Sequence, residues 1–242
     1  MQSYRAVLYS MSALMGESYE DEEILENQFS LGRNELKELR QYIGPRKWRS
    51  RVLSDIKNEI TVAIQDGKET QIYPDTGTVT RVVLNKYSNT EPSDELVENI
   101  IRTFNRVNDF TLSQSSLHVV QTIFDRNYMQ SILSNSIIPA RMYAEKLKQL
   151  GIGHYFDTVL CSSDLGVSKP NPEFFAMALE AMGLNAQDVL FIADNIETDV
   201  AGAASMGIPT ILVNRYTQIP ELPGNVALVH DIKQILDYLP QV

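Results

Sequence analysis

Short apolar runs alternate with helical patterns through the second half of this 242-residue chain, and this alternation constrains the fold more than any other feature. The apolar runs are residues 130–135, 157–163, 189–194, 209–214 and 226–229, and the helical patterns are 139–151, 171–183, 197–207 and 231–239. Strands that alternate with helices of this length indicate βαβ units. The runs are continuously apolar, as expected when both faces of a sheet are covered. The sequence therefore predicts an α/β protein with a Rossmann-like parallel sheet and helices on both faces.

Local signals support single elements of this pattern. Asn171 is a suitable N-cap, Pro172 occupies the first helical position, and Gly183 follows the last one. Residues 6–9 predict a further strand near the start, and residues 115–127 predict a helix before the second strand.

The region between residues 16 and 112 breaks the alternation. Helical patterns are found at residues 19–29, 33–44 and 94–107. Residues 59–85 are rich in Thr, Val and Ile and contain Asp-Gly and Thr-Gly pairs, which predicts strand and hairpin structure. We therefore expect a core domain formed by residues 1–15 and 113–242, and an inserted cap domain, residues 16–112, over the carboxyl ends of the strands.

Charge and hydropathy argue against several classes of function. The net charge of −10 opposes general nucleic-acid binding, which needs a cationic surface. Residues 45–51 form a basic run around Trp48, which is interpreted as a solvated turn, with a clamp for an anionic ligand or partner as the alternative. No apolar run approaches the roughly 20 residues that span a bilayer. The first residues lack a signal-peptide pattern, so a cytoplasmic protein without membrane contact is expected.

The cysteine and the histidines indicate structural roles. Cys161 is the only cysteine, which excludes an intrachain disulfide and a Cys-rich zinc site. Its apolar neighbours predict a buried thiol rather than a nucleophile. His118, His154 and His230 share no ligand spacing.

Polar side chains lie at four places where a parallel sheet brings its strand ends to one edge. In chain order these are Ser10 and Ser12, Ser134 and Asn135, Lys169, and Asp194 with Asp199. A hydroxyl, a lysine and carboxylates around one point suit a phosphate or carboxylate held beside a divalent cation. Taken alone, Ser134 is as readily a turn residue, and Asp199 a helix-start residue favoured by the helix dipole.

Three segments resemble motifs of the haloacid dehalogenase-like (HAD) hydrolase superfamily. Residues 132–136 resemble the second motif, residues 166–183 the lysine motif, and residues 189–214 the fourth motif. The Lys-Pro-x-Pro and Asp-Asn-x-x-x-Asp-x-x-Gly-Ala segments are jointly very specific. The insertion after the first strand resembles the first type of cap domain, although its predicted β content departs from that mostly helical cap.

The resemblance implies a role for each matching residue. Ser134, with Asn135 beside it, would bind phosphoryl oxygens. Lys169 would neutralise negative charge on the nucleophile and the phosphate. Asp194 would be a Mg²⁺ ligand, and Asp199 would support the outer shell of the metal or Lys169.

The first motif departs from the family pattern. Members that transfer phosphoryl groups carry Asp-x-Asp-Gly-Thr-Leu there, with the first aspartate as nucleophile and the second as general acid and base. Here the aligned residues are Ser10-Met11-Ser12-Ala13-Leu14-Met15. Both catalytic carboxylates are therefore replaced by serines.

These replacements change the expected chemistry. A serine hydroxyl has no appreciable anionic fraction at neutral pH, and Lys169 is expected to keep its proton beside two carboxylates. Mg²⁺ would be held by Asp194 and the backbone carbonyl of Ser12, and one expected carboxylate is gone, so weak binding or none is expected. Lys169 could then pair with Asp194.

Two readings of the function follow. In the first, favoured by the missing aspartates, the chain lacks standard phosphatase activity and is a binding, regulatory or scaffolding module for a small anionic or phosphorylated ligand or a protein partner. In the second, favoured by the other intact motifs, it is an active HAD-family hydrolase (phosphatase-type) of small phosphorylated metabolites. Its altered nucleophile would be Ser10 or a cap carboxylate such as Asp66 or Asp75.

Two further alternatives are weaker. Dehalogenation of haloacids also needs the first aspartate of the family motif. A purely structural role for lysine–aspartate pairs at the strand ends would need no ligand at all.

Overall fold

The structure is a computed structural model, which describes residues 4–15, 33–44, 49–73, 75–103, 111–214 and 221–241. Its centre is a six-stranded parallel sheet with the strand order β3-β2-β1-β4-β5-β6. The strands are β1 (Ala6–Ser10), β2 (Met129–Ser134), β3 (Thr158–Cys161), β4 (Val189–Ala193), β5 (Thr210–Val213) and β6 (Val226–Val229). The predicted α/β class with a parallel sheet is therefore confirmed.

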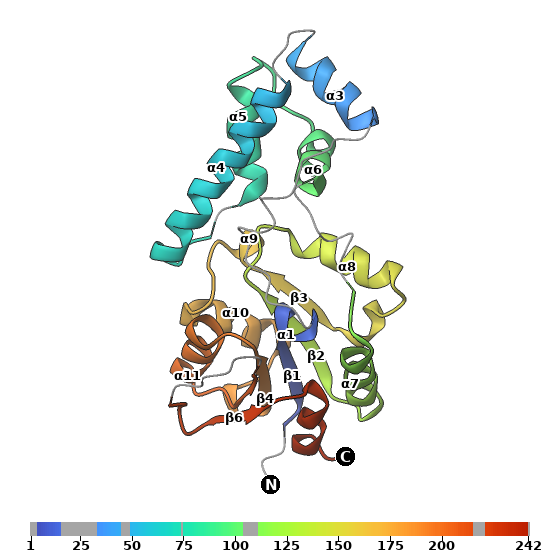
Figure 1. The fold of residues 1–242 in the computed structure, drawn as a ribbon, viewed down its shortest axis with the longest axis vertical. Coiled ribbons are helices and arrows are strands. Elements are labelled where there is room, and N and C mark those ends of the chain that lie inside the picture. The colour runs from blue at the N-terminus through green and yellow to red at the C-terminus, as the bar shows by residue number, and fades with distance from the viewer. Residues whose placement is uncertain are drawn as a thin grey trace.

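Helices cover both faces of the sheet (Figure 1). They are α1 (Met11–Met15), α7 (Gln114–Asp125), α8 (Ala140–Gln149), α9 (Ser162–Leu165), α10 (Pro172–Met182) and α11 (Ala201–Ser205), with the short turns η2 (Gly153–Tyr155), η3 (Ala186–Asp188), η4 (Ile196–Val200) and η5 (Ile232–Tyr238). As predicted, the Asn171 side chain caps α10 by accepting a hydrogen bond from the Glu173 N–H, and Gly183 ends it with a left-handed φ of +63°.

The central strand β1 alternates between two buried clusters. Val7 and Tyr9 belong to the cluster that includes α7, α8 and η5, whereas Ala6 and Leu8 belong to the cluster under α10 and α11. Every residue of β1 is buried, which explains its continuous apolar run. Although β1 comes first in the chain, it lies between β2 and β4, because Ala6 pairs with both Met129 and Val189.

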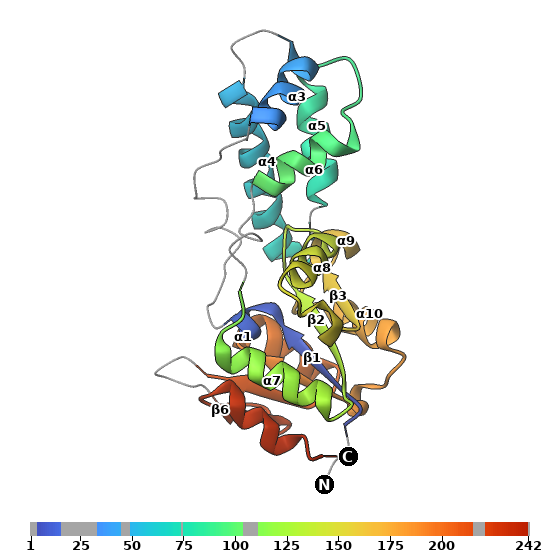
Figure 2. The same cartoon turned by 90° about the vertical axis from the view of Figure 1, so that its right-hand side faces the viewer.

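Among the described residues, a group of helices lies beyond the carboxyl ends of the strands in both views (Figures 1 and 2). These are α3 (Arg33–Ile43), α4 (Arg49–Thr70), α5 (Thr76–Asn85) and α6 (Asp94–Thr103), and we call them the helical segment. Buried residues of α4, α5 and α6 belong to the same apolar cluster as Tyr9 of the sheet.

The strand and hairpin structure predicted for residues 59–85 is wrong for most of this range, because residues 59–70 form the carboxyl-terminal half of α4 and residues 76–85 form α5. The exception is a single antiparallel bridge at Ile72. Ile56, Ile60 and Ile64 are fully buried and follow one another at intervals of four residues. This spacing places them on one face of a helix, and their burial outweighs the preference of β-branched residues for strands.

The Asp-Gly and Thr-Gly pairs in the same range lie inside a helix and at the start of a helix, not in hairpin turns. Asp75 is the N-cap of α5, and its carboxylate accepts hydrogen bonds from the Gly77 N–H and the Thr78 hydroxyl. Asp66 and Gly67 lie inside α4. An aspartate before a Thr-Gly pair therefore marks a helix start here, where a hairpin turn was predicted.

Some predictions lie outside the described residues. These are the helical pattern at 19–29, the end of the pattern at 94–107, and most of the basic run at 45–51. The expected domain limits stay a prediction. Cys161 is buried, as predicted. Within the described ranges, we find no helix with the length and apolar character needed to cross a membrane.

The helical form of α4 predicts unequal effects of two neighbouring substitutions. We expect Ile60→Ala to lower the free energy of unfolding by about 2–5 kcal/mol, because it leaves a cavity. Val62, which is 52% exposed, should tolerate Val62→Ala within about 0.5 kcal/mol. Urea unfolding measures both changes. A strand would place residues 60 and 62 on the same face, so equal losses would contradict the helix.

Candidate active site

Three neighbouring strands bring the predicted site residues together. In the order β2-β1-β4, they end at Ser134, Ser10 and Ala193, and Asp194 follows directly. Helix α1 begins immediately after β1 and carries Ser12. The structure joins five of the predicted residues in one hydrogen-bonded cluster: Ser10, Ser12, Lys169, Asp194 and Asp199.

The two serines form a hydrogen-bonded chain that ends on a carboxylate. Ser12 Oγ donates to Asp194 Oδ1 at 2.6 Å, and the Oγ atoms of Ser10 and Ser12 lie 3.1 Å apart. Because Ser12 has a single hydroxyl proton, it must accept from Ser10. Lys169 Nζ donates to Ser10 Oγ at 3.0 Å. All four groups are therefore connected in one direction, from the ammonium through both hydroxyls to Asp194.

A buried ion pair joins Lys169 to Asp199, not to Asp194 as considered from the sequence. Lys169 Nζ lies 2.7 Å from Asp199 Oδ1, and both side chains are at least 96% buried, with exposures of 4% and 1%. In the part of the chain that the structure describes, Oδ1 has no well-aligned hydrogen bond, so this contact is an ion pair. Asp199 Oδ2 accepts from the backbone N–H groups of Asp194 and Asn195.

Lys169 has two further contacts inside the sheet. Its Nζ donates to the Leu133 carbonyl oxygen at 3.2 Å and lies 5.9 Å from the centre of the Phe191 ring. The ammonium therefore contacts residues of β2, β1 and β4. No sequence pattern indicates the Leu133 carbonyl as a partner, because a main-chain acceptor carries no residue preference.

The two aspartates have opposite shifts in pKa. Burial raises the pKa of Asp194 from 3.8 to about 6, and the negative charge of Asp199 adds to this effect, against the Ser12 hydrogen bond and the charge of Lys169. Burial also acts to raise the pKa of Asp199, but the charge of the Lys169 ammonium, together with the hydrogen bond from the Asp194 backbone N–H, outweighs it and lowers the pKa. Asp199 is thus the permanent partner of Lys169, whereas Asp194 is the carboxylate that can exchange a proton near neutral pH.

Ser134 and Asn135 have different surroundings. Asn135 forms two hydrogen bonds with the main chain of Lys169. Its Oδ1 accepts from the Lys169 N–H at 2.8 Å, and its Nδ2 donates to the Lys169 carbonyl at 2.9 Å. These bonds make Asn135 a positioning residue. Ser134 is buried, and among the described residues its hydroxyl has no hydrogen-bond partner. Its role as a ligand group stays a prediction.

The cap carboxylates considered as alternative nucleophiles do not reach this cluster. Both oxygens of Asp75 are bound at the N-terminus of α5. Asp66 is an exposed residue of α4. Within the described ranges, neither forms a hydrogen bond or ion pair with Ser10, Lys169 or Asp194.

The donor atoms fit a resident Mg²⁺ poorly. Asp194 is the one carboxylate of the cluster that has no ion pair with Lys169, and its Oδ1 already accepts from Ser12. Mg²⁺ requires near-octahedral oxygen ligands and is usually held by one or two carboxylates together with substrate phosphates. In the part of the chain that the structure describes, no three His, Cys, Asp or Glu side chains gather as possible ligands. The groups that the site itself supplies for chemistry are therefore its hydroxyls, its ammonium and its carboxylates.

Comparison with known sequences identifies a family. The model described as haloacid dehalogenase-like hydrolase matches residues 52–213. Glyceraldehyde 3-phosphate phosphatase of Methanothermobacter thermautotrophicus is 30% identical over 139 residues, which cover 54% of this chain and 61% of that protein. Phosphoserine phosphatase of Thermus thermophilus is 34% identical over 90 residues, covering 37% of this chain and 35% of that protein. The matches thus span less than two thirds of these relatives.

Solved structures show the same fold over nearly the whole chain. The 2-haloacid dehalogenase of Pseudomonas syringae pv. Tomato has a TM-score of 0.63 and 19% identity, with 97% of each chain covered. A further dehalogenase, determined with an intermediate complex, has a TM-score of 0.59 and 18% identity, with 99% of this chain and 98% of that chain covered. At these identities the likeness concerns the fold alone.

The buried ion pair predicts a large effect of Asp199→Asn on stability. We expect the free energy of unfolding to fall by about 3–5 kcal/mol, because the Lys169 ammonium would stay buried without its counter-charge. Glu59→Gln is the matched control, since Glu59 also lies 2.7 Å from a lysine, Lys86, in an exposed pair. That change should cost about 1 kcal/mol or less. Similar losses for both variants in urea unfolding would contradict this account.

The raised pKa of Asp194 predicts a distinct titration. ¹³C NMR should detect a carboxyl group with a pKa of about 6, and Ser12→Ala should raise it further by removing a hydrogen bond to the charged form. The buried Ser131 provides the control Ser131→Ala, which should leave this pKa unchanged.

The raised pKa of Asp194 also determines how the free energy of unfolding changes with pH. Because the folded protein binds the Asp194 proton more tightly than the unfolded chain, the contribution of Asp194 to the free energy of unfolding falls as pH rises from about 4 to about 6. Above that range it is constant. A titration near the ordinary value of 3.8 would refute both expectations.

Proposed function

Because this chain belongs to the haloacid dehalogenase-like hydrolase family, we propose that it is a phosphatase-type hydrolase of small phosphorylated molecules, with Ser10 as its nucleophile. Curated relatives named as phosphatases support this proposal over a loss of catalysis. The class of substrate is proposed only as a phosphate ester or anhydride, since the matches span part of each relative.

The hydrogen bonds from Ser10 through Ser12 to Asp194 are the observation that most directly supports Ser10 as the nucleophile. A serine needs a base to become a nucleophile, and these hydrogen bonds give the Ser10 proton a path to a carboxylate. The Lys169 ammonium, 3.0 Å from Ser10 Oγ, favours the negative charge that develops on that oxygen. Because Lys169 is expected to keep its proton, Asp194 is the base, and Ser12 lies between it and Ser10.

The proposed reaction has two steps. Ser10 Oγ forms a bond to phosphorus while the bond to the leaving oxygen breaks, and the Ser10 proton moves to Ser12 as the Ser12 proton moves to Asp194. The leaving oxygen takes a proton from water. The resulting hydroxide attacks the phosphoserine, the bond between phosphorus and Ser10 breaks, and Asp194 returns the proton through Ser12. The sum is hydrolysis of the ester to an alcohol and phosphate.

Binding without turnover is the second candidate. The loss of both family aspartates favours it, as does the Lys169–Asp199 pair, which already neutralises the ammonium. In this case the chain would hold a small anionic ligand or contact a protein partner, and no covalent intermediate would form.

Turnover of a phosphate-ester panel distinguishes the two candidates. The panel should include aryl and acyl phosphates, because among the described residues no second carboxylic acid is placed to protonate a leaving oxygen. We expect measurable hydrolysis, a phosphoryl adduct on Ser10 by mass spectrometry, and a loss of about 10²–10⁴-fold in kcat for Ser12→Ala.

The controls for this experiment are Ser10→Ala and Ser131→Ala. Ser10→Ala should abolish both the adduct and turnover. Ser131→Ala removes a buried hydroxyl of β2 that has no hydrogen-bond partner among the described residues, and it should leave turnover unchanged. Phosphate binding in the absence of any adduct or turnover would favour the second candidate and reject the first.

A further inference from the structure

A short connection between two helices of the helical segment pairs with the loop that leads to Lys169. Residues 71–73 follow α4, and the loop consists of residues 166–168. The Tyr73 N–H donates to the Gly166 carbonyl at 2.9 Å, and the Ser168 N–H donates to the Gln71 carbonyl at 3.2 Å. Ile72 and Val167 thus form an antiparallel bridge. We call residues 71–73 the docking strand.

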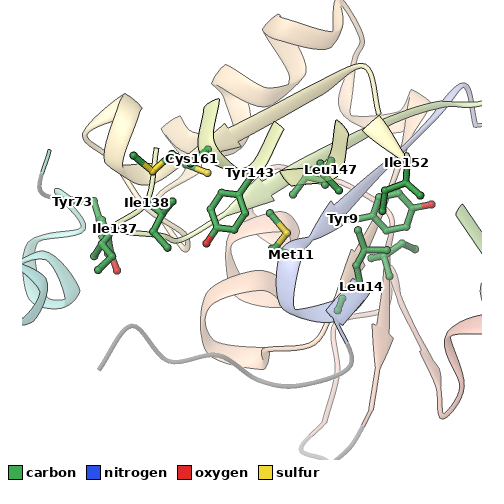
Figure 3. Close-up of a cluster of buried hydrophobic side chains, with 14 of the residues drawn as sticks. Tyr9, Met11, Leu14, Tyr73, Ile137, Ile138, Tyr143, Leu147, Ile152 and Cys161 are labelled. Carbon is green, nitrogen blue, oxygen red and sulfur yellow. The ribbon is translucent and has the colours of Figure 1, made fainter. Parts of the chain in front are cut away.

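The docking strand is anchored in the core on the same side. Tyr73 is buried and belongs to the apolar cluster that includes Ile137 and Ile138, and Figure 3 shows it at the end of the cluster where these two residues lie. Three residues further along the chain, the buried Thr76 hydroxyl donates to the Ile137 carbonyl at 2.7 Å. The connection between α4 and α5 is therefore fixed to the core at several points.

The loop before Lys169 has other contacts besides this bridge. The Gly166 N–H donates to the Ser162 carbonyl at 2.9 Å, and Val167 packs against the apolar cluster under α10 and α11. The Ser168 carbonyl accepts from the Asn171 N–H, and Lys169 itself is held by Asn135. The only hydrogen bonds that the structure gives to the Ser168 N–H and the Gly166 carbonyl, within the described residues, come from the docking strand. Because Ser168 directly precedes Lys169, a shift of this loop moves the backbone from which the ammonium extends.

We propose that the docking strand is a positioning element for Lys169: its pairing with residues 166–168 holds the ammonium against Ser10 and Asp199. The helical segment thereby controls the geometry of the strand-end cluster through main-chain hydrogen bonds, without contributing a side chain to it. The consequence for turnover rests on the proposed function, whereas the positioning itself does not.

The backbone of Gln71 provides a way to weaken this contact at one residue. Its φ is +59°, in the left-handed region that glycine adopts freely and β-branched residues avoid. Gln71→Val should therefore disfavour the bridge, and Gln71→Gly is the matched control, since it removes the same side chain and accepts the same φ.

Amide hydrogen exchange measures the effect without any substrate. In Gln71→Val we expect exchange at the Ser168 and Lys169 amides to accelerate about tenfold, the order of one lost hydrogen bond, while amides of β5 stay unchanged. In Gln71→Gly both loop amides should exchange within about twofold of the original protein. The Lys169 amide is decisive, because its own hydrogen bond is to Asn135.

A reversible crosslink provides a second test that does not depend on Gln71→Val folding. Ile72 and Val167 form a non-hydrogen-bonded antiparallel pair, for which Cα atoms lie about 4.5 Å apart, within the range of about 4.4–6.8 Å for disulfides. In an Ile72→Cys, Val167→Cys protein that also carries Cys161→Ala, oxidation should slow exchange at the Lys169 amide, and reduction should reverse it. Added to Gln71→Val, the oxidised pair should restore protection.

The outcomes separate this proposal from the proposed function. If Lys169 exchange is the same in Gln71→Val, Gln71→Gly and both redox forms of the crosslinked protein, the docking strand does not position Lys169 and the proposal is overturned. If exchange changes as expected and kcat falls more than KM rises in Gln71→Val, both proposals are supported. Exchange changes in a protein without turnover would reject the hydrolase and uphold the positioning.

Discussion

The buried pair of Lys169 and Asp199 is the interaction on which the arrangement of the strand ends depends. Taking two charges out of water is costly, and the cost is offset only if both have good partners. Here Asp199 also accepts two backbone N–H groups after β4, and Lys169 reaches the hydroxyl of Ser10 and a carbonyl of β2. One ion pair thereby fixes the relative positions of three strand ends. Because Asp199 neutralises part of the Lys169 charge, the ammonium attracts an anionic ligand less strongly.

The serines of the first motif take part in this network. In place of two carboxylates, which would have added negative charge beside Asp194 and Asp199, the chain has two neutral hydroxyls that relay a hydrogen bond. Within the described part of the chain, the Lys169 ammonium pairs with Asp199 alone. Asp194 is left as the carboxylate with a raised pKa, because it is buried near Asp199 and receives only part of the compensation from Lys169.

The sequence predicts the parts of the structure that depend on local pattern. The continuous apolar strands, the cap residues of α10 and the gathering of polar residues at the strand ends follow from rules about neighbours in the chain. Residues 59–85 misled this reasoning, because their β-branched composition suggested strands while the four-residue spacing of Ile56, Ile60 and Ile64 indicated a helix. The direction of the hydroxyl chain and the choice of Asp199 over Asp194 required distances. The range predicted as strand includes residues 71–73, but their pairing with residues 166–168 could not have been predicted, since it is formed by main-chain groups that every residue carries.

The position of β1 in the sheet has a consequence for how the chain reaches its native state. The apolar strand β1 precedes both of its partners in the chain, since β2 begins at Met129 and β4 begins at Val189, and its pairing is complete only after both have been synthesised. Until then both of its edges carry unpaired N–H and C=O groups, the feature that allows strands of different molecules to join. Parallel pairing over such sequence separations is slow because long loops must close first. Until β2 and β4 have formed, pairing of the β1 edges with other molecules therefore competes with folding.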